Sequence, residues 1–365
     1  MTESDISKFA KVRPTGSIVI DEMIRCDGDD FAGLDSHIDI ACFTHIHDDH
    51  IRALPDSIAQ CSNVLMTKLT KELANEIFGE NDSTWLDIRR NVFGLEIGEK
   101  HGKKIGDYTI SFIKNNHILG SGQLLVRSSE FSTLYSSDFT VPGTDIVKDV
   151  DYLILDSTHG AFSRSQKFES PSMAHKLIVD KAKEILEIEK KPLIIRAHRG
   201  TLQKVMSWIR SEIDEQIPFF SNEIERKIAT VYSRHGFECG DVKEEEEWNA
   251  YYLRNHPFVR FLPISTSPLD CEKVFPPVPS IRIGSSTSTS LETLTDMFIV
   301  NLQEHAIIDE VLEYVNKINP KYVIIDNSSR VSNPNNPSTL FQEIKKIKPV
   351  YLSPELHPKI LNQNM

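Results

Sequence analysis

The chain has 365 residues, 39% of them hydrophobic and 26% charged, which is ordinary for a folded protein with two or three structural units. Its five cysteines are scattered without a CxxC pair, which argues against a zinc ribbon and predicts a cytoplasmic protein, or a nuclear one in a eukaryote. The net charge of −12 excludes a broadly basic surface, so any polyanionic partner has to be held locally. We expect neither a membrane-spanning helix nor a signal peptide, because no apolar run is long enough.

Short apolar runs dominate the first half of the chain. Residues 17–27 and 38–44 are predicted to be strands, and the second leads directly into the octet FTHIHDDH at 43–50. Two helical segments follow, the second of which ends at Gly79. Four further strands are then expected in YTISFIKNNH, SGQLLVRS, STLYSSDF and VDYLILDST. Strands that end in polar side chains place chemistry at one edge of a sheet in α/β enzymes.

The second half of the chain is also predicted to mix helices and strands. Residues 168–190 have helical periodicity, and KPLIIRAHRGTLQKVMSWI indicates a strand followed by a helix. Further strands are expected in IATVYS, FVRFLPI and SIRIG, and the segment IIDEVLEYVNKINPKYVIIDN predicts a helix, a turn and a strand.

The octet is the strongest functional pattern in the sequence. His45 and His47 are two residues apart, so an extended backbone directs both side chains to the same side, and Asp49 and His50 follow at once. Imidazole and carboxylate groups at this density suit Zn²⁺ or a similar metal. A polar loop that happens to be rich in histidine is the competing interpretation. The HxHxDH spacing after a strand favours a metal site, as do candidate ligands near later strand ends, in NNHILGSG and YSSDF.

These motifs resemble those of the metallo-β-lactamase fold. THIHDDH resembles its HxHxDH signature, His117 with Gly120 and Ser121 is similar to its next ligand motif, and YSSDF resembles the strand that carries a metal-bridging aspartate. The resemblance implies an αββα sandwich and a metal-bound hydroxide as the nucleophile. The implied zinc ligands are His45, His47 and His117 on one ion, Asp49 and His50 on the second, and Asp138 between the two. In nuclease-type members an acidic residue ahead of the cluster orients the ligands, and Asp27 and Asp30 both qualify for that role.

Two later motifs resemble the β-CASP branch of this fold, whose members are DNA and RNA nucleases. LILDSTHG, with Asp156, resembles its [DE]-[ST]-T motif, and His305 takes the place of a histidine that precedes a helix. The 149 positions between them (305 − 156) leave room for an inserted domain. The resemblance therefore implies a core made of 1–160 and 295–365, with a smaller α/β cap at 161–294 and the active site in the cleft between them. Asp156 as catalytic partner would keep His305 protonated, so that His305 can donate a proton to the leaving oxygen.

The substrate is less well determined by the sequence. RNA-cleaving relatives carry another histidine where this chain has Asp326, and DNA-directed relatives similar to the Artemis group lack it. This difference predicts a nuclease that prefers single-stranded DNA to RNA, as a DNA repair or processing exonuclease does. It also predicts a weaker second site that Mn²⁺ or Mg²⁺ could fill. His198, Arg199 and Ser286 are the candidate substrate-binding residues. A β-CASP ribonuclease, a small-molecule hydrolase of the same fold and an inactive scaffold are the alternatives.

Overall fold

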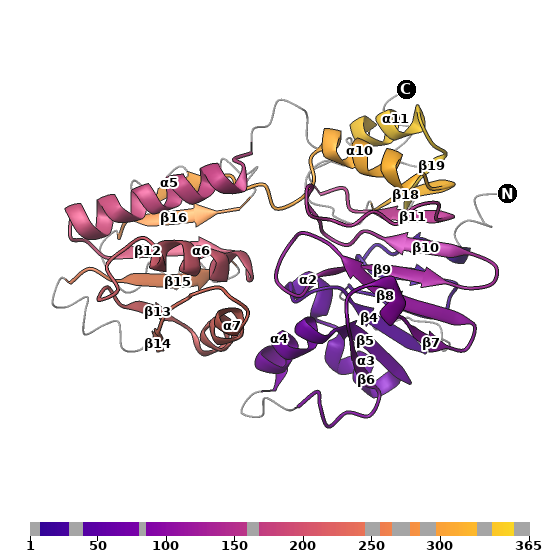
Figure 1. Ribbon diagram of the computed structural model, residues 1–365, viewed down its shortest axis with the longest axis horizontal. Coiled ribbons are helices and arrows are strands. Elements are labelled where there is room, and N and C mark those ends of the chain that lie inside the picture. Colours follow the sequence, from indigo (N-terminus) through magenta and orange to yellow (C-terminus); the bar gives the residue numbers. More distant parts are fainter. Residues whose placement is uncertain are drawn as a thin grey trace. The chain divides into compact units, whose positions relative to one another are not determined.

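The computed structural model describes residues 8–28, 39–79, 85–158, 168–244, 256–264, 278–284, 297–326 and 338–353. The chain divides into two compact units, drawn in Figure 1. The first comprises Met1–Asn75, Asn81–Gln166 and His305–Met365, and the second comprises Glu76–Glu80 and Lys167–Glu304. Helices and strands are interspersed along the chain, and the strands form three sheets, which confirms the expected α/β class. In the described part of the chain, no helix has both the length and the apolar character needed to span a membrane.

The first unit contains two mixed sheets. The first sheet has the order β1-β2-β3-β4-β5-β6, with β1 Lys11–Val12, β2 Ile18–Ile20, β3 Ile24–Cys26, β4 Ile40–Phe43, β5 Asn63–Thr67 and β6 Val92–Leu95. The second sheet has the order β19-β18-β11-β10-β9-β8-β7, with β7 Lys103–Ile105, β8 Tyr108–Lys114, β9 Gly122–Arg127, β10 Ser132–Tyr135, β11 Tyr152–Leu155, β18 Tyr322–Asp326 and β19 Val350–Ser353. Strands β10, β11 and β18 are parallel neighbours, so their carboxyl ends lie at one edge of the second sheet.

The two sheets pack face to face through a shared apolar core. Cys26 and Cys42 of the first sheet belong to the same buried cluster as Leu124 and Ile154 of the second. On the far side of the second sheet, α10 (Ile308–Ile318) buries one apolar stripe at helical spacing, together with α11 (Ser338–Lys345). The remaining helices of this part are α2 Asp48–Ile51, α3 Leu54–Gln60, α4 Lys68–Phe78 and the short η1 Glu99–His101. Helix α3 contacts β5 but contributes nothing to the core between the sheets, so it lies on the outer face of the first sheet.

The second unit is built on a fully parallel sheet. Its order is β14-β13-β15-β12-β16-β17, with β12 Leu193–Ala197, β13 Phe219–Ser221, β14 Val242–Glu244, β15 Val259–Pro263, β16 Ser280–Ile283 and β17 Met297–Val300. The helices in the described part of this unit include α5 Pro171–Lys183 with its continuation η2 Glu184–Ile188, α6 Thr201–Arg210 and α7 Glu223–Arg234. Strand β17 pairs with β16, so residues 297–300, expected in the C-terminal part of the core, lie in this sheet, and the second unit ends at Glu304.

Two predicted strands have a different structure. Residues 17–27 form a hairpin, because Asp21 and Glu22 adopt positive φ angles of 50° and 55° and turn the chain between β2 and β3. IATVYS, expected to be a strand, lies inside α7. Its Ile228, Val231 and Tyr232 are buried at the i, i+3, i+4 spacing of one helix face, and this spacing outweighs the strand preference of β-branched residues.

Candidate metal centre

The predicted ligands of the first unit follow the ends of its strands. His45 and His47 come directly after β4, and His50 lies one turn into α2. His117 follows β8 and Asp138 follows β10. These segments are far apart in the sequence, so the mixed topology of the two sheets is what brings their side chains together.

Four of these side chains converge on one point. One ligand atom from each of His45, His47, His117 and Asp138 lies within 4.8 Å of the others. Asp138 Oδ2 is 3.6 Å from Nε2 of both His45 and His117, and His117 Nε2 is 3.3 Å from His47 Nδ1. Ligands about 2.0–2.2 Å from a tetrahedral zinc are separated by distances of this size. The described residues can therefore hold a metal ion.

The hydrogen bonds behind His45 leave its other ring nitrogen available to a metal. The Thr44 hydroxyl donates to Asp27 Oδ2 at 2.6 Å, so its oxygen accepts from Nδ1 of His45 at 3.0 Å. In that tautomer, Nε2 carries a lone pair. This Nε2 is buried and has no hydrogen-bond partner among the described residues. A metal ion bound to Nε2 would supply the missing partner. This buried nitrogen without a partner is therefore the evidence that the residues of the site suit a metal.

Asp27 also positions His50. Its Oδ2 accepts from His50 Nδ1 at 2.9 Å, and its Oδ1 accepts from the Thr44 backbone N–H at 2.9 Å. One carboxylate, 2% exposed, therefore fixes the ring orientation of two predicted ligands. Of the two residues left open by the sequence, Asp27 occupies the orienting position, and Asp30 lies outside the described residues.

The predicted second ligand set is less complete. His50 Nε2 is 3.4 Å from Asp138 Oδ2, but it is 3.9 Å from Oδ2 of Asp49, whose side chain is 79% exposed. Among the described residues, neither Asp49 nor Asp326 belongs to a group of converging ligand atoms. The ligand atoms of the first set thus converge, whereas Asp49 does not join a converging group in the described residues.

Neighbouring charges perturb the buried histidines. Burial, reinforced by the other imidazoles, lowers the pKa of His45 well below its ordinary value. Burial acts in the same direction on His50, but Asp138 and Asp27 outweigh it and raise the pKa of His50 well above normal. Proton binding therefore opposes metal binding more strongly at His50 than at His45.

The buried Asp156 and the partly buried His305 form a pair beside this cluster. His305 Nδ1 is 2.8 Å from Asp156 Oδ2, and these two residues form a second group of potential ligands with Asp138. Burial alone would raise the pKa of the Asp156 carboxyl, but the charge and hydrogen bond of His305 lower it to about 2. The carboxylate is therefore ionised at neutral pH and orients the imidazole. The two rings of His305 and His117 lie 5.3 Å apart, which places His305 next to the ligands.

Two of the candidate substrate-binding residues, His198 and Arg199, are described, and both lie in the second unit. The Arg199 guanidinium is paired at 3.0 Å with Glu225, which is fully buried, so this side chain is engaged inside the second unit. His198 is exposed, and Ser286 lies outside the described residues.

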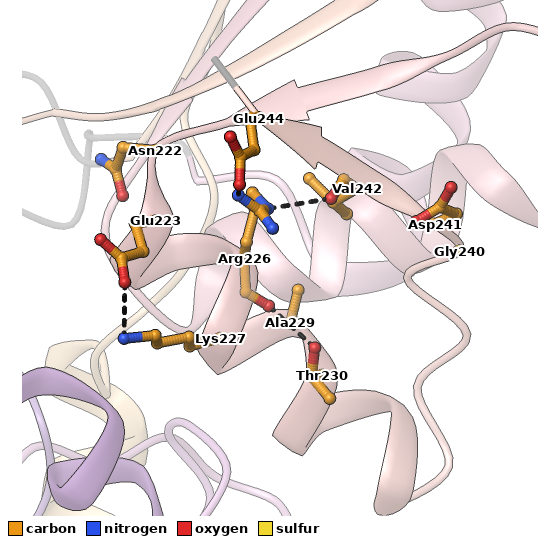
Figure 2. Close-up of a pocket in the computed structure, with 10 residues that line it drawn as sticks. All are labelled: Asn222, Glu223, Arg226, Lys227, Ala229, Thr230, Gly240, Asp241, Val242 and Glu244. Carbon is orange, nitrogen blue, oxygen red and sulfur yellow. Dashed lines mark hydrogen bonds and ion pairs between the residues drawn. The ribbon is translucent and has the colours of Figure 1, made fainter. Parts of the chain in front are cut away.

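A separate cavity of about 560 Å³ lies on the second unit, between α7 and β14 (Figure 2). Its two cationic side chains already have carboxylate partners. Arg226 pairs with Glu244 at 2.9 Å, and Lys227 pairs with Glu223 at 2.7 Å. None of the predicted site residues lines this cavity, so it is distinct from the metal centre.

Some residues that support the site carry no sequence pattern. Thr44 and Ser137 bond to each other at 2.8 Å behind His45, and Asn115 Nδ2 donates to the Asp138 backbone carbonyl at 2.8 Å. Their positions next to the motif residues were the only available signal. Hydroxyl and amide side chains are too common for that signal to identify them.

Comparisons with known proteins address the fold only. No protein-family model matches the sequence, and no curated protein matches it. A crystal structure of a protein of unknown function from Enterococcus faecalis V583 is similar, with a TM-score of 0.52 and 12% sequence identity. The match covers 85% of this chain and 89% of that one. The likeness therefore extends over both units and concerns their architecture.

Proposed function

We propose that the protein is a metal-dependent hydrolase of nucleic-acid phosphodiester bonds, with single-stranded DNA as the preferred substrate. The observation that carries the proposal is the preformed set of His45, His47, His117 and Asp138, with the Asp156–His305 pair beside it. Resemblance to metallo-β-lactamase nucleases of the β-CASP branch supplies the reaction class. The two face-to-face sheets with outer helices support an αββα core, and the parallel α/β unit between Gln166 and His305 supports an inserted cap domain.

Each part of the site has a role in this reaction. A bound divalent ion would act as a Lewis acid and lower the pKa of a water molecule towards neutrality. The three histidines and Asp138 would hold the ion, and Asp27, through the Thr44 hydroxyl, would keep the lone pair of His45 directed at it. His305, held at Nδ1 by an ionised carboxylate, would donate a proton from Nε2 to the leaving oxygen of the substrate.

The two ligand sets favour different ions. Three imidazoles and one carboxylate suit Zn²⁺, so we infer zinc at the preformed set. The set around Asp49 and His50 would be weaker because the Asp49 carboxylate is solvent-exposed. Its carboxylate oxygens also accept Mn²⁺ or Mg²⁺.

The preference for DNA rests on Asp326, which stands where RNA-cleaving relatives have a histidine. The test is cleavage of labelled single strands of DNA and RNA of identical sequence by the zinc-loaded protein, before and after chelation. We expect faster cleavage of DNA, loss of activity on chelation and recovery with added metal. Faster cleavage of RNA would replace the DNA assignment with a ribonuclease, and absence of any cleavage would overturn the nuclease proposal.

A further inference from the structure

Arg25 is a buried cation next to the proposed metal centre, and no predicted motif contains it. It lies on β3, is 1% exposed and is among the largest fully buried side chains of the protein. An arginine is almost never this buried unless its guanidinium is well bonded. Here Nη2 donates to the backbone carbonyls of Asp27 at 3.3 Å and Gly28 at 3.1 Å, and Nε donates to Ser17 Oγ at 3.3 Å.

These carbonyls belong to a turn that needs support. Asp27 and Gly28 both have left-handed backbone conformations, with φ angles of 55° and 84°. A non-glycine residue is disfavoured in this region, so contacts that hold the backbone of Asp27 stabilise the turn. At Gly28 a Cβ atom would lie 2.2 Å from Ser17 Oγ, so the turn is packed directly against Ser17. The Ser17 hydroxyl in turn donates to the Asp27 carbonyl at 3.2 Å.

The turn sets the direction of the Asp27 carboxylate. From this position the carboxylate reaches Thr44 and His50, and through the Thr44 hydroxyl it also fixes the ring of His45. A shift of the turn would move the acceptor for both imidazoles at once. We propose that Arg25 is a positioning residue for the metal centre, acting by clamping the Asp27–Gly28 turn; this inference rests on the metal binding assumed in the proposed function.

The shape of the guanidinium is central to this role. Its N–H groups are arranged as a rigid fork, so one side chain bonds to two successive carbonyls and a hydroxyl at the same time. A lysine at position 25 would keep the positive charge, but a single ammonium group cannot reproduce the fork. Arg25→Lys therefore separates the effect of geometry from the effect of charge.

Cobalt(II) binding tests the proposal, because the visible spectrum of Co²⁺ reports its coordination geometry. The variants are Arg25→Lys and Ser17→Ala; the second keeps the guanidinium and removes one contact of the turn. Arg127→Lys is the matched control, since Arg127 bonds at 2.6 Å to Glu99 on the surface of the second sheet. We expect about tenfold weaker Co²⁺ binding and an altered spectrum for both variants, the usual size for a lost outer contact, and no change in the control.

The fold of each variant is checked by circular dichroism, and binding is measured on the folded protein. If Arg25→Lys does not fold, Ser17→Ala alone decides. Wild-type affinity and an unchanged spectrum in the folded variants would overturn the positioning role and leave the proposed function intact. Failure of the wild-type protein to bind Co²⁺ or Zn²⁺ would instead overturn the metal centre itself, and this inference with it.

Discussion

Replacing Asp27 by asparagine should weaken metal binding while leaving the fold intact. Asparagine has nearly the same shape as aspartate and tolerates the positive φ of 55° at this position. The change therefore removes charge and one acceptor without straining the backbone. Any effect on the metal centre can then be assigned to the hydrogen bonds of the carboxylate.

The size of the effect follows from those hydrogen bonds. Three donors face the two oxygens of Asp27: the N–H and O–H of Thr44, and Nδ1–H of His50. An amide has a single oxygen, so at least one buried donor would face the NH₂ group instead. Losing a hydrogen bond to a charged group costs about 1.5–3 kcal/mol. At 1.4 kcal/mol per factor of ten, this corresponds to roughly 10–100-fold weaker zinc binding, the range found for outer-shell partners.

Zinc affinity is measured by competition with a coloured chelator. Asp151→Asn is the matched control, because Asp151 Oδ2 likewise accepts from a backbone N–H and a hydroxyl, both of Ser132. These two residues lie at the N-terminal ends of β11 and β10, whereas Asp138 follows the carboxyl end of β10. We expect the control to bind zinc as the wild type does. An Asp27→Asn protein that is folded and binds zinc within twofold of the wild type would refute the orienting role.

Three further predictions address neighbouring groups. His305→Ala should keep the zinc of the preformed ligand set and lose about 10²–10⁴-fold in cleavage rate, measured together with metal content; parallel loss of metal and rate would make His305 a ligand. The pKa of the Asp156 carboxyl is lowered to about 2 in the folded protein and is near 3.9 in the unfolded chain. Its carboxylate therefore stabilises the fold at pH values above about 3.9, and this contribution is lost as the pH falls towards 2. The difference in unfolding free energy between wild type and Asp156→Asn should therefore be about 2 kcal/mol at pH 7 and shrink between pH 5 and pH 3; a gap independent of pH would contradict this. Burial raises the pKa of Cys61 and Cys239 to about 11, so both thiols should react with a disulfide reagent far more slowly in the native protein than in denaturant.

Part of the candidate ligand set could be predicted because two of its residues lie in one short motif. His45 and His47 are recognisable from HxHxDH alone, and the structure places both beside His117 and Asp138. The strand ends that carry these residues could be predicted as well, since apolar runs and turn residues alternate clearly in the first half of the chain. The exposed position of Asp49 could not be predicted, because the motif does not define the path of α2.

Other features depend on contacts that a linear sequence does not record. The clamp formed by Arg25 depends on the left-handed turn at Asp27 and Gly28, and only the folded hairpin brings Ser17 to it. The ion pair between Arg199 and Glu225 joins the turn before α6 to α7, and the sequence does not record that this guanidinium has a buried carboxylate partner. In IATVYS the β-branched residues favoured a strand, whereas the spacing of the apolar residues favoured a helix. The segment is helical because that spacing lets Ile228, Val231 and Tyr232 be buried on one helix face.

The central claim is that hydrolysis depends on the ligand set that Asp138 completes. Asp138 Oδ2 lies within 3.6 Å of three imidazole nitrogens, those of His45, His50 and His117, so it adjoins candidate ligands of both proposed sets. The decisive measurement is the rate at which zinc-treated Asp138→Ala cleaves single-stranded DNA, relative to the wild type and to Asp145→Ala, which alters an exposed residue nearby. The account predicts that Asp138→Ala loses both activity and bound metal, while Asp145→Ala retains them. Wild-type cleavage and metal content in Asp138→Ala would contradict it.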